Sequence, residues 1–76
     1  MTELSVYLRH AKRSNKRELD LSNRELNYIP KEVFAMRTLE ELDLSNNKIG
    51  IIEPDIKELL RLKVLNLENN ALTELP

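Results

Sequence analysis

The stretch ELDLSN occupies residues 18–23 and is repeated without change at residues 41–46, which lie 23 positions further along the chain. A period of roughly 20–50 residues is typical of chains built from stacked structural units. Aligning the sequence at this period brings apolar residues into columns that run through three copies. The columns are Leu19, Leu42 and Leu65; Leu21, Leu44 and Leu67; Leu26, Ile49 and Leu72; and Ile29, Ile52 and Leu75.

Each copy predicts one strand followed by one helical return. The two leucines of ELDLS alternate with polar residues, and this period of two is typical of a half-buried strand. An asparagine follows the strand at Asn47 and Asn70, where its side chain can bond backbone groups as the chain turns. The apolar residues of the return segments are Val33 and Met36 in the first copy and Ile56 and Leu59 in the second. One unit cannot bury its apolar side alone, so the copies are predicted to stack into an α/β solenoid with a leucine core.

The sequence of the repeat resembles that of the leucine-rich repeat family. The family pattern LxxLxLxxNxL stands here as LEELDLSNNKI from residue 39 and as LKVLNLENNAL from residue 62. The 23-residue period and the LDLSNN segment resemble the Ras-group intracellular members, including Ras suppressor-like proteins. This resemblance implies a short parallel sheet on a concave face and helical or 3-10 returns on a convex face. It also implies a scaffold or signalling regulator that binds a protein partner inside the cell, in the cytoplasm or the nucleus.

The segment ahead of the repeats predicts an amphipathic helix that covers the open end of the leucine core. Leu4, Leu8 and Ala11 recur on one helix face. Tyr7 lies beside them, and Thr2 is a candidate N-cap residue. A helix that binds a partner or a membrane surface is the competing interpretation. The predicted division is a capping helix at 1–15 followed by repeats at 16–38, 39–61 and 62–76, the last of them incomplete.

Three features depart from the repeat pattern. The first copy has Lys16 in place of the leading leucine and Arg24 in place of the turn asparagine, which marks it as an N-terminal edge with no preceding repeat. Pro54 comes one place later than Pro30 would predict, and this offset indicates an altered turn after Ile52. The third copy stops after its Leu-Pro step, so we expect either a cut from a longer solenoid or a much reduced protein.

The composition argues against catalysis and against a bound cofactor. The chain has a net charge of −1, no cysteine and a single glycine, Gly50. Disulfides, cysteine-based metal sites and a glycine-rich phosphate loop are therefore excluded. His10 is the only histidine, and a solvated side chain is a simpler interpretation of it than a general base. We predict no enzyme activity, no metal or cofactor, no small-molecule substrate and no membrane span.

The basic run RHAKRSNKR at residues 9–17 has two interpretations. It could be a nuclear-import or nucleic-acid patch. Alternatively, its cations lie at the C-terminal end of the capping helix, where they interact favourably with the helix dipole. No aromatic residues are interleaved for base stacking and the net charge is negative, so nucleic-acid binding is disfavoured.

The polar residues of the strands carry the prediction about binding. Side chains alternate along a strand, so the residues between the core leucines are expected to face solvent on the concave face. Stacking collects five carboxylates there and no lysine or arginine, which favours a protein partner with a basic surface. The predicted partner-binding residues are Glu18, Asp20, Ser22, Glu41, Asp43, Ser45, Val64, Asn66 and Glu68. A purely structural role in the repeat is the alternative for these residues.

Self-assembly is a second functional hypothesis. An uncapped third copy would expose its leucines beside an unpaired strand edge, and such edges pair with other chains. The leucines concerned are Leu65, Leu67, Leu72 and Leu75. In this alternative the chain is a structural element that associates through its C-terminal repeat.

Overall fold

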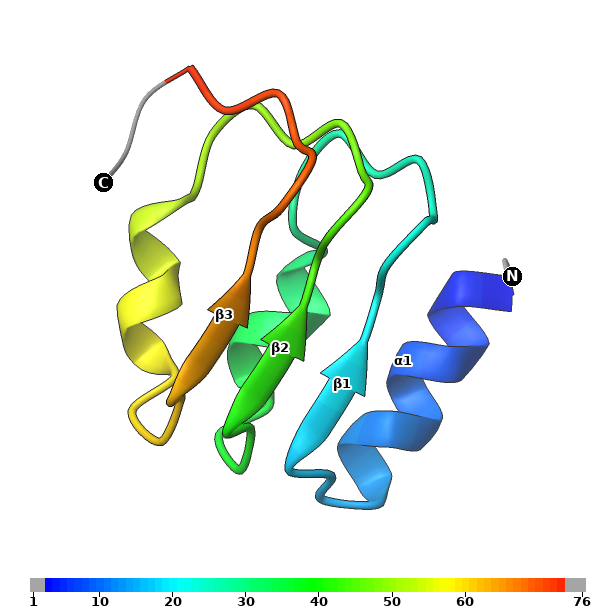
Figure 1. The fold of residues 1–76 in the computed structure, drawn as a ribbon. Helices are drawn as coiled ribbons and strands as arrows, with labels where there is room; N and C mark the ends of the chain where they lie inside the picture. The colour runs from blue at the N-terminus through cyan, green and yellow to red at the C-terminus, as the bar shows by residue number, and fades with distance from the viewer. Residues whose placement is uncertain (1–2, 74–76) are drawn as a thin grey trace.

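Helices and strands alternate along the chain in the order that the repeat predicts. The structure, a computed structural model, describes residues 3–73. Its elements are α1 (Glu3–Arg13), β1 (Glu18–Asp20), the 3-10 helix η1 (Lys31–Ala35), β2 (Glu41–Asp43), the 3-10 helix η2 (Pro54–Glu58) and β3 (Val64–Asn66). Figure 1 shows the strands side by side, with α1 next to β1 and the 3-10 helices behind the sheet. The predicted α/β repeat fold, with a helix at its N-terminal end, is confirmed.

The three strands form one parallel sheet in the order β1-β2-β3. Its register pairs residues that are one repeat apart, so that Leu19 lies opposite Leu42 and Leu42 lies opposite Leu65. Backbone bonds continue beyond the strands themselves, for example from the Leu21 N–H to the Asp43 oxygen at 2.8 Å. A slip of one residue would turn every strand leucine toward solvent, so burial of the leucines holds this register.

One leucine core lies between the sheet and the 3-10 helices, and α1 closes its N-terminal end. Leu8 and Ala11 of α1 are buried. Leu4 and Tyr7 pack against the core from partly buried positions. The predicted amphipathic helix is therefore confirmed over α1, while the candidate N-cap Thr2 lies outside the described residues. The fully buried side chains of the core are Leu8, Leu21, Ile29, Val33, Leu39, Leu42, Leu44 and Ile49.

The two 3-10 helices have the same geometry although their prolines occupy different positions. Pro30 precedes η1 with φ −57° and ψ 138°, and Glu53 precedes η2 with φ −69° and ψ 145°. Pro54 is the first residue of η2. The prediction of an altered turn after Ile52 is therefore wrong. Proline fixes φ near about −65°, and this value suits both the residue before a helical turn and the first residue within it.

Asn47 ties the first two repeats together from a buried position. Its side-chain oxygen Oδ1 accepts bonds from the backbone N–H groups of Arg24 and Leu26, both at 3.0 Å. Its Nδ2 donates to the carbonyl oxygens of Leu21 and Leu44, both at 2.9 Å. The asparagine one repeat later makes the same kind of bonds between the second and third repeats. The predicted bonds from these asparagines to backbone groups at the turn are confirmed, and they also join neighbouring repeats.

A second asparagine column bends the chain out of each strand. Asn23, Asn46 and Asn69 have φ angles of 55°, 55° and 54°. This left-handed conformation is strained for most residues, and asparagine tolerates it better than most because its side chain bonds locally. The Nδ2 of Asn69 also donates to Oδ1 of Asn46 at 2.9 Å. These asparagines therefore have a structural reason to recur.

Candidate partner-binding surface

A hollow of about 500 Å³ lies over the exposed face of the sheet. Every strand contributes to it, because alternate strand residues point away from the leucine core. Tyr7 joins it from α1, and Lys16 joins it from the segment between α1 and β1. We call this feature the strand-face hollow. Its lining residues are Tyr7, Lys16, Glu18, Leu19, Asp20, Glu41, Leu42, Asp43, Val64 and Asn66.

The strand-face hollow brings together only part of the set of residues predicted to bind a partner. Ser22, Ser45 and Glu68 lie outside its lining. Ser45 is only 7% exposed, so the prediction that it faces solvent is wrong. Ser22 is half-buried and Glu68 is exposed. The predicted residues that do line the hollow are Glu18, Asp20, Glu41, Asp43, Val64 and Asn66.

The two Asp-x-Ser segments terminate their strands with the same pair of hydrogen bonds. Oδ1 of Asp20 accepts bonds from the Ser22 N–H at 2.9 Å and from the Ser22 hydroxyl at 2.6 Å. Oδ1 of Asp43 accepts the same two bonds from Ser45, also at 2.9 and 2.6 Å. The bonds from Ser22 favour the ionised carboxylate and lower the pKa of Asp20 below its ordinary value. The Oδ1 atom of each aspartate thus accepts bonds within the turn, and a binding partner would contact Oδ2.

Glu18 and Glu41 lie opposite each other on neighbouring strands. A hydrogen bond to the Glu18 carboxyl, followed by repulsion from the Glu18 charge, raises the pKa of Glu41 above its ordinary value. Within residues 3–73, neither carboxylate forms an ion pair with a lysine or an arginine. The pair therefore presents negative charge that no cation of the described chain neutralises, and a cation from a partner would favour its ionised form.

Tyr7 places cations at the α1 end of the strand-face hollow. The Lys16 Nζ lies 5.8 Å from the centre of the Tyr7 ring, and the Arg24 Cζ lies 4.8 Å from it. Both distances fall within the range of cation–π attraction. The Tyr7 hydroxyl donates to the backbone oxygen of Asp20 at 3.3 Å. Because Lys16 lines the hollow, the prediction of a binding face without lysine or arginine is wrong at this end.

A sequence signal for this junction exists, but the repeat pattern alone does not explain it. Lys16 and Arg24 are the two residues of the first repeat that replace its expected leucine and asparagine. The pattern suggests that they lie at an edge without a neighbour, whereas both lie against Tyr7 of α1. Tyr7 lies outside the repeated segment, so the repeat period cannot predict which residue it meets.

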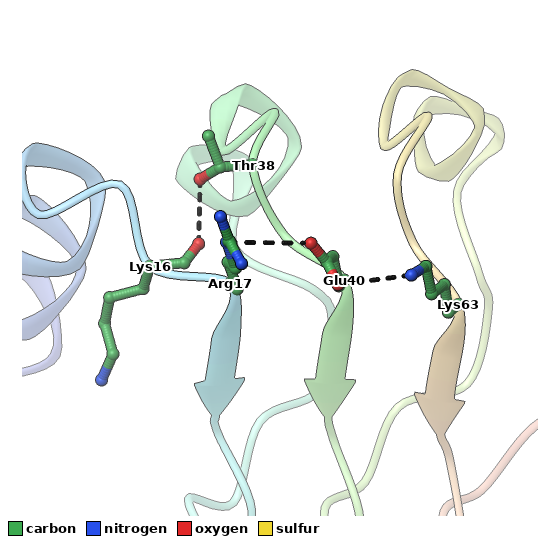
Figure 2. Close-up of polar contacts among 5 residues, drawn as sticks. All are labelled: Lys16, Arg17, Thr38, Glu40 and Lys63. Carbon is green, nitrogen blue, oxygen red and sulfur yellow. Dashed lines mark hydrogen bonds and ion pairs between the residues drawn. The ribbon is translucent and has the colours of Figure 1, made fainter.

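A row of alternating charge crosses the beginnings of the strands (Figure 2). The Glu40 carboxylate lies between Arg17, whose Nε is 3.8 Å away, and Lys63, whose Nζ is 3.6 Å away. The Thr38 hydroxyl donates to the backbone oxygen of Lys16 at 2.9 Å, beside this row. The neighbouring cations of the predicted basic run are thus separated: Lys16 lies at Tyr7 and Arg17 at Glu40.

The outer edge of β3 has no neighbouring strand within the described part of the chain. Leu65, Leu67 and Leu72 are partly buried against the core. Val64 is 49% exposed, although it stands in the same column as Glu18 and Glu41. The exposure predicted for this end is therefore partial for the three leucines, and the fourth, Leu75, lies outside the described residues.

Residues 3–73 contain neither a metal-binding cluster nor a membrane-spanning helix. No group of three or more His, Cys, Asp or Glu side chains within this range is placed to hold a metal ion. No helix in the same range is both long enough and apolar enough to cross a membrane.

Comparison with known proteins identifies the repeat. The family model described as leucine rich repeat matches residues 14–72. The matched region contains all three strands and both 3-10 helices. No curated protein matches the chain.

Proposed function

The chain belongs to the leucine-rich repeat family, and on this premise we propose that it is a protein-interaction module. Stacked repeats of this kind generally present an extended surface to other proteins. The proposed organisation is a capping helix at 1–15 followed by repeats at 16–38, 39–61 and 62–76. A non-catalytic scaffold or signalling role inside the cell, as in the Ras-group members that the repeat resembles, is part of this proposal.

The proposed binding surface is the strand-face hollow, and the partner is a protein with a basic surface. The observation that carries this proposal is the Glu18–Glu41 pair, which lies on adjacent strands without a neutralising cation among the described residues. A lysine or arginine of a partner would remove the repulsion between these carboxylates. Asp20 and Asp43 add to the negative charge, while Ser45 contributes to the turn and is not proposed as a contact.

The proposed interaction is weak when only these three repeats take part. A stable interface buries about 800 Å² on each partner. Three strands of three residues each, spaced about 4.8 Å apart, offer a smaller area than this. We therefore expect dissociation constants in the micromolar range or weaker for a partner that touches the strand-face hollow alone.

Differential capture from a cell extract tests the proposal. The bait is the full 76-residue chain, either unchanged or with Glu18→Lys and Glu41→Lys together. This double variant keeps two like charges side by side, so it should change the sign of the surface with little effect on folding. The matched control carries Glu32→Lys and Asp55→Lys, which are exposed on the 3-10 helices and change the net charge by the same amount.

The proposal expects a set of proteins, quantified by mass spectrometry, that the unchanged chain and the control retain and the double variant loses. A capture profile that is the same for all three baits would contradict it. Circular dichroism of each bait establishes that it is folded.

The β3 edge favours a second candidate function, self-association. Alternate backbone groups of a strand point to opposite edges, and the N–H groups on the β2 side of β3 include that of Val64, which donates to Glu40. The backbone N–H groups of Leu65 and Leu67 therefore point away from β2, beside partly buried leucine side chains. Sedimentation velocity from micromolar to millimolar concentration tests this candidate, and a constant monomer mass over that range would remove it.

A further inference from the structure

We infer that the strand-face hollow selects an extended partner segment with a basic residue at its centre, an acidic residue two positions to one side and an apolar residue two positions to the other. This inference rests on the proposed function and names the class of partner more closely. It follows from three contact points that lie in a fixed order across the sheet.

The order of the contact points follows from the order of the elements. α1 lies beside β1, and β2 and β3 follow in turn (Figure 1). Tyr7 and Lys16 therefore occupy one end of the strand-face hollow, and the Glu18–Glu41 pair spans β1 and β2. Val64 occupies the other end, on β3. The hollow thus presents a cation, a carboxylate pair and an apolar side chain in sequence.

Each contact point lacks a strong partner within the described part of the chain. Lys16 forms no ion pair there and rests only near the Tyr7 ring, which leaves its charge open to an acidic group. The Glu18–Glu41 pair lacks a cation in the same range. Val64 is 49% exposed in a column whose other two members are glutamates, so it offers apolar contact where the repeat predicts a polar group.

The spacing of the points suits alternate residues of an extended chain that crosses the strands. Neighbouring strands lie about 4.8 Å apart, so the midpoint of the Glu18–Glu41 pair lies about 7 Å from Val64. Alternate residues of an extended segment are about 6.6 Å apart and project to the same side. A segment with its basic residue over the pair therefore places a residue two positions away over Val64. The residue two positions away on the other side lies past β1, at the end of the hollow that Lys16 and Tyr7 line.

The central position distinguishes this inference from general attraction between opposite charges. The order acidic, basic, apolar can be written from the N-terminus or from the C-terminus of the partner segment, because the basic residue is at the centre in both cases. Exchanging the acidic and basic residues places a carboxylate over the Glu18–Glu41 pair and an additional cation over Lys16. Composition and net charge stay the same, so only the order of the groups changes.

The probes are two fluorescent nonapeptides of identical composition. The test peptide is Ser-Ser-Glu-Ser-Arg-Ser-Leu-Ser-Ser, and the control peptide has its Glu and Arg exchanged. Fluorescence anisotropy with the full chain should give at least about threefold tighter binding of the test peptide, which is the scale of one or two exposed ion pairs.

A charge swap tests whether Lys16 is the contact for the acidic residue. Lys16→Glu should weaken the test peptide about threefold and should favour a peptide in which the Glu is replaced by Arg. The matched control is Lys31→Glu, because Lys31 is exposed on η1, away from the strand-face hollow. This control should leave both affinities unchanged. Circular dichroism checks that each variant is folded.

The possible outcomes separate the inference from the proposed function. Equal binding of the two nonapeptides, with loss of both in the Glu18→Lys and Glu41→Lys variant, overturns the inference and supports an acidic binding face. Binding that this variant does not change contradicts both. No saturable binding up to millimolar peptide overturns the inference alone, and differential capture then decides the proposed function.

Discussion

The first and third repeats place leucines at the same strand positions and in the same register, yet they bury them to different extents. Leu19 is only 2% exposed and Leu21 is fully buried, whereas Leu65 and Leu67 remain partly buried. The first repeat has α1 on its outer side, where Leu8 is buried in the core. No strand or helix covers the outer side of β3 within residues 3–73. A leucine in this fold therefore completes its burial only when structural units lie on both sides of it.

Removing one leucine from each environment should give the largest effect. Leu44 is fully buried in the middle repeat, and we expect Leu44→Ala to lower the free energy of unfolding by roughly 3 kcal/mol, through lost burial and the cavity that remains. Leu67→Ala, one repeat later, should cost about half as much because solvent already reaches that side chain. Urea unfolding followed by circular dichroism measures both values.

If Leu44→Ala does not fold, substitution by valine at the same two positions gives a milder comparison. Leu44→Val and Leu67→Val remove less volume, and a buried aliphatic shortening of this size costs about 1 kcal/mol. Equal losses at the two positions, with either pair of variants, would show that the third repeat is as well covered as the second.

Asparagine truncation should sharpen the same comparison with a somewhat smaller effect. Asn47→Ala leaves the N–H groups of Arg24 and Leu26 and the buried carbonyl of Leu21 without their bonds to Asn47, at a cost of about 2–3 kcal/mol. Asn70→Ala should cost about 1 kcal/mol, because Asn70 is only half-buried and the Leu44 carbonyl that it bonds keeps its bond from Asn47. Chemical unfolding of the two variants gives the difference, and a larger loss at Asn70 would contradict it.

Loosening α1 should make the first repeat more like the third. Tyr7→Leu removes the ring near Lys16 and Arg24 as well as the bond to Asp20, and we expect a loss of about 1 kcal/mol. Hydrogen exchange should then become faster in α1 and β1 before it does so in β2. Tyr28→Leu is the matched control, since Tyr28 is exposed and should give no change. If hydrogen exchange in α1 and β1 is unchanged in the Tyr7 variant, the cation–π contacts do not stabilise the packing of α1 against β1.

The smallest expected effect concerns pH and the neighbouring carboxylates of β1 and β2. The folded-state pKa of Glu41 lies above its ordinary value of 4.5, so the folded chain binds more protons than the unfolded chain between the two values. The stability from this group is thus complete below pH 4.5 and is lost as the pH rises through the raised pKa. Asp20 behaves oppositely. Its contribution is present above its ordinary value of 3.8 and is lost as the pH falls through its lowered pKa.

Glu41→Gln should therefore raise the urea midpoint at neutral pH slightly and flatten its dependence on pH in the acidic range. Urea unfolding at a series of pH values measures this, with Glu32→Gln on η1 as the control. A lower midpoint for Glu41→Gln at neutral pH would contradict the sign of the shift.

The features that recur in each repeat could be predicted from the sequence, because the interactions that cause them are local and periodic. The leucine columns define the strands and their register, and Asn47 makes the backbone bonds expected at its position. The predicted turn change at Pro54 was wrong for a reason that is also local. The backbone before η2 is extended, as it is before η1, whichever of the two positions holds the proline.

The features of the surface that depend on packing between different elements could not be predicted in this way. The contacts of Tyr7 with Lys16 and Arg24 depend on how α1 lies against β1, which no repeat period specifies. Strand alternation predicts that Ser45 faces solvent. The chain leaves the strand before this residue, however, and its hydroxyl turns to Asp43. Alternation therefore holds within β2 and fails one turn beyond it.

The Glu40 carboxylate between Arg17 and Lys63 has a consequence for misfolding. Proteins built from nearly identical repeats can misfold when a strand pairs with the strand of a repeat that is not its neighbour in sequence. If the first strand paired directly with the third, Arg17 and Lys63 would meet as like charges without an intervening carboxylate. The two ELDL segments cannot be told apart by their leucines, but this row of charges makes their order in the array matter.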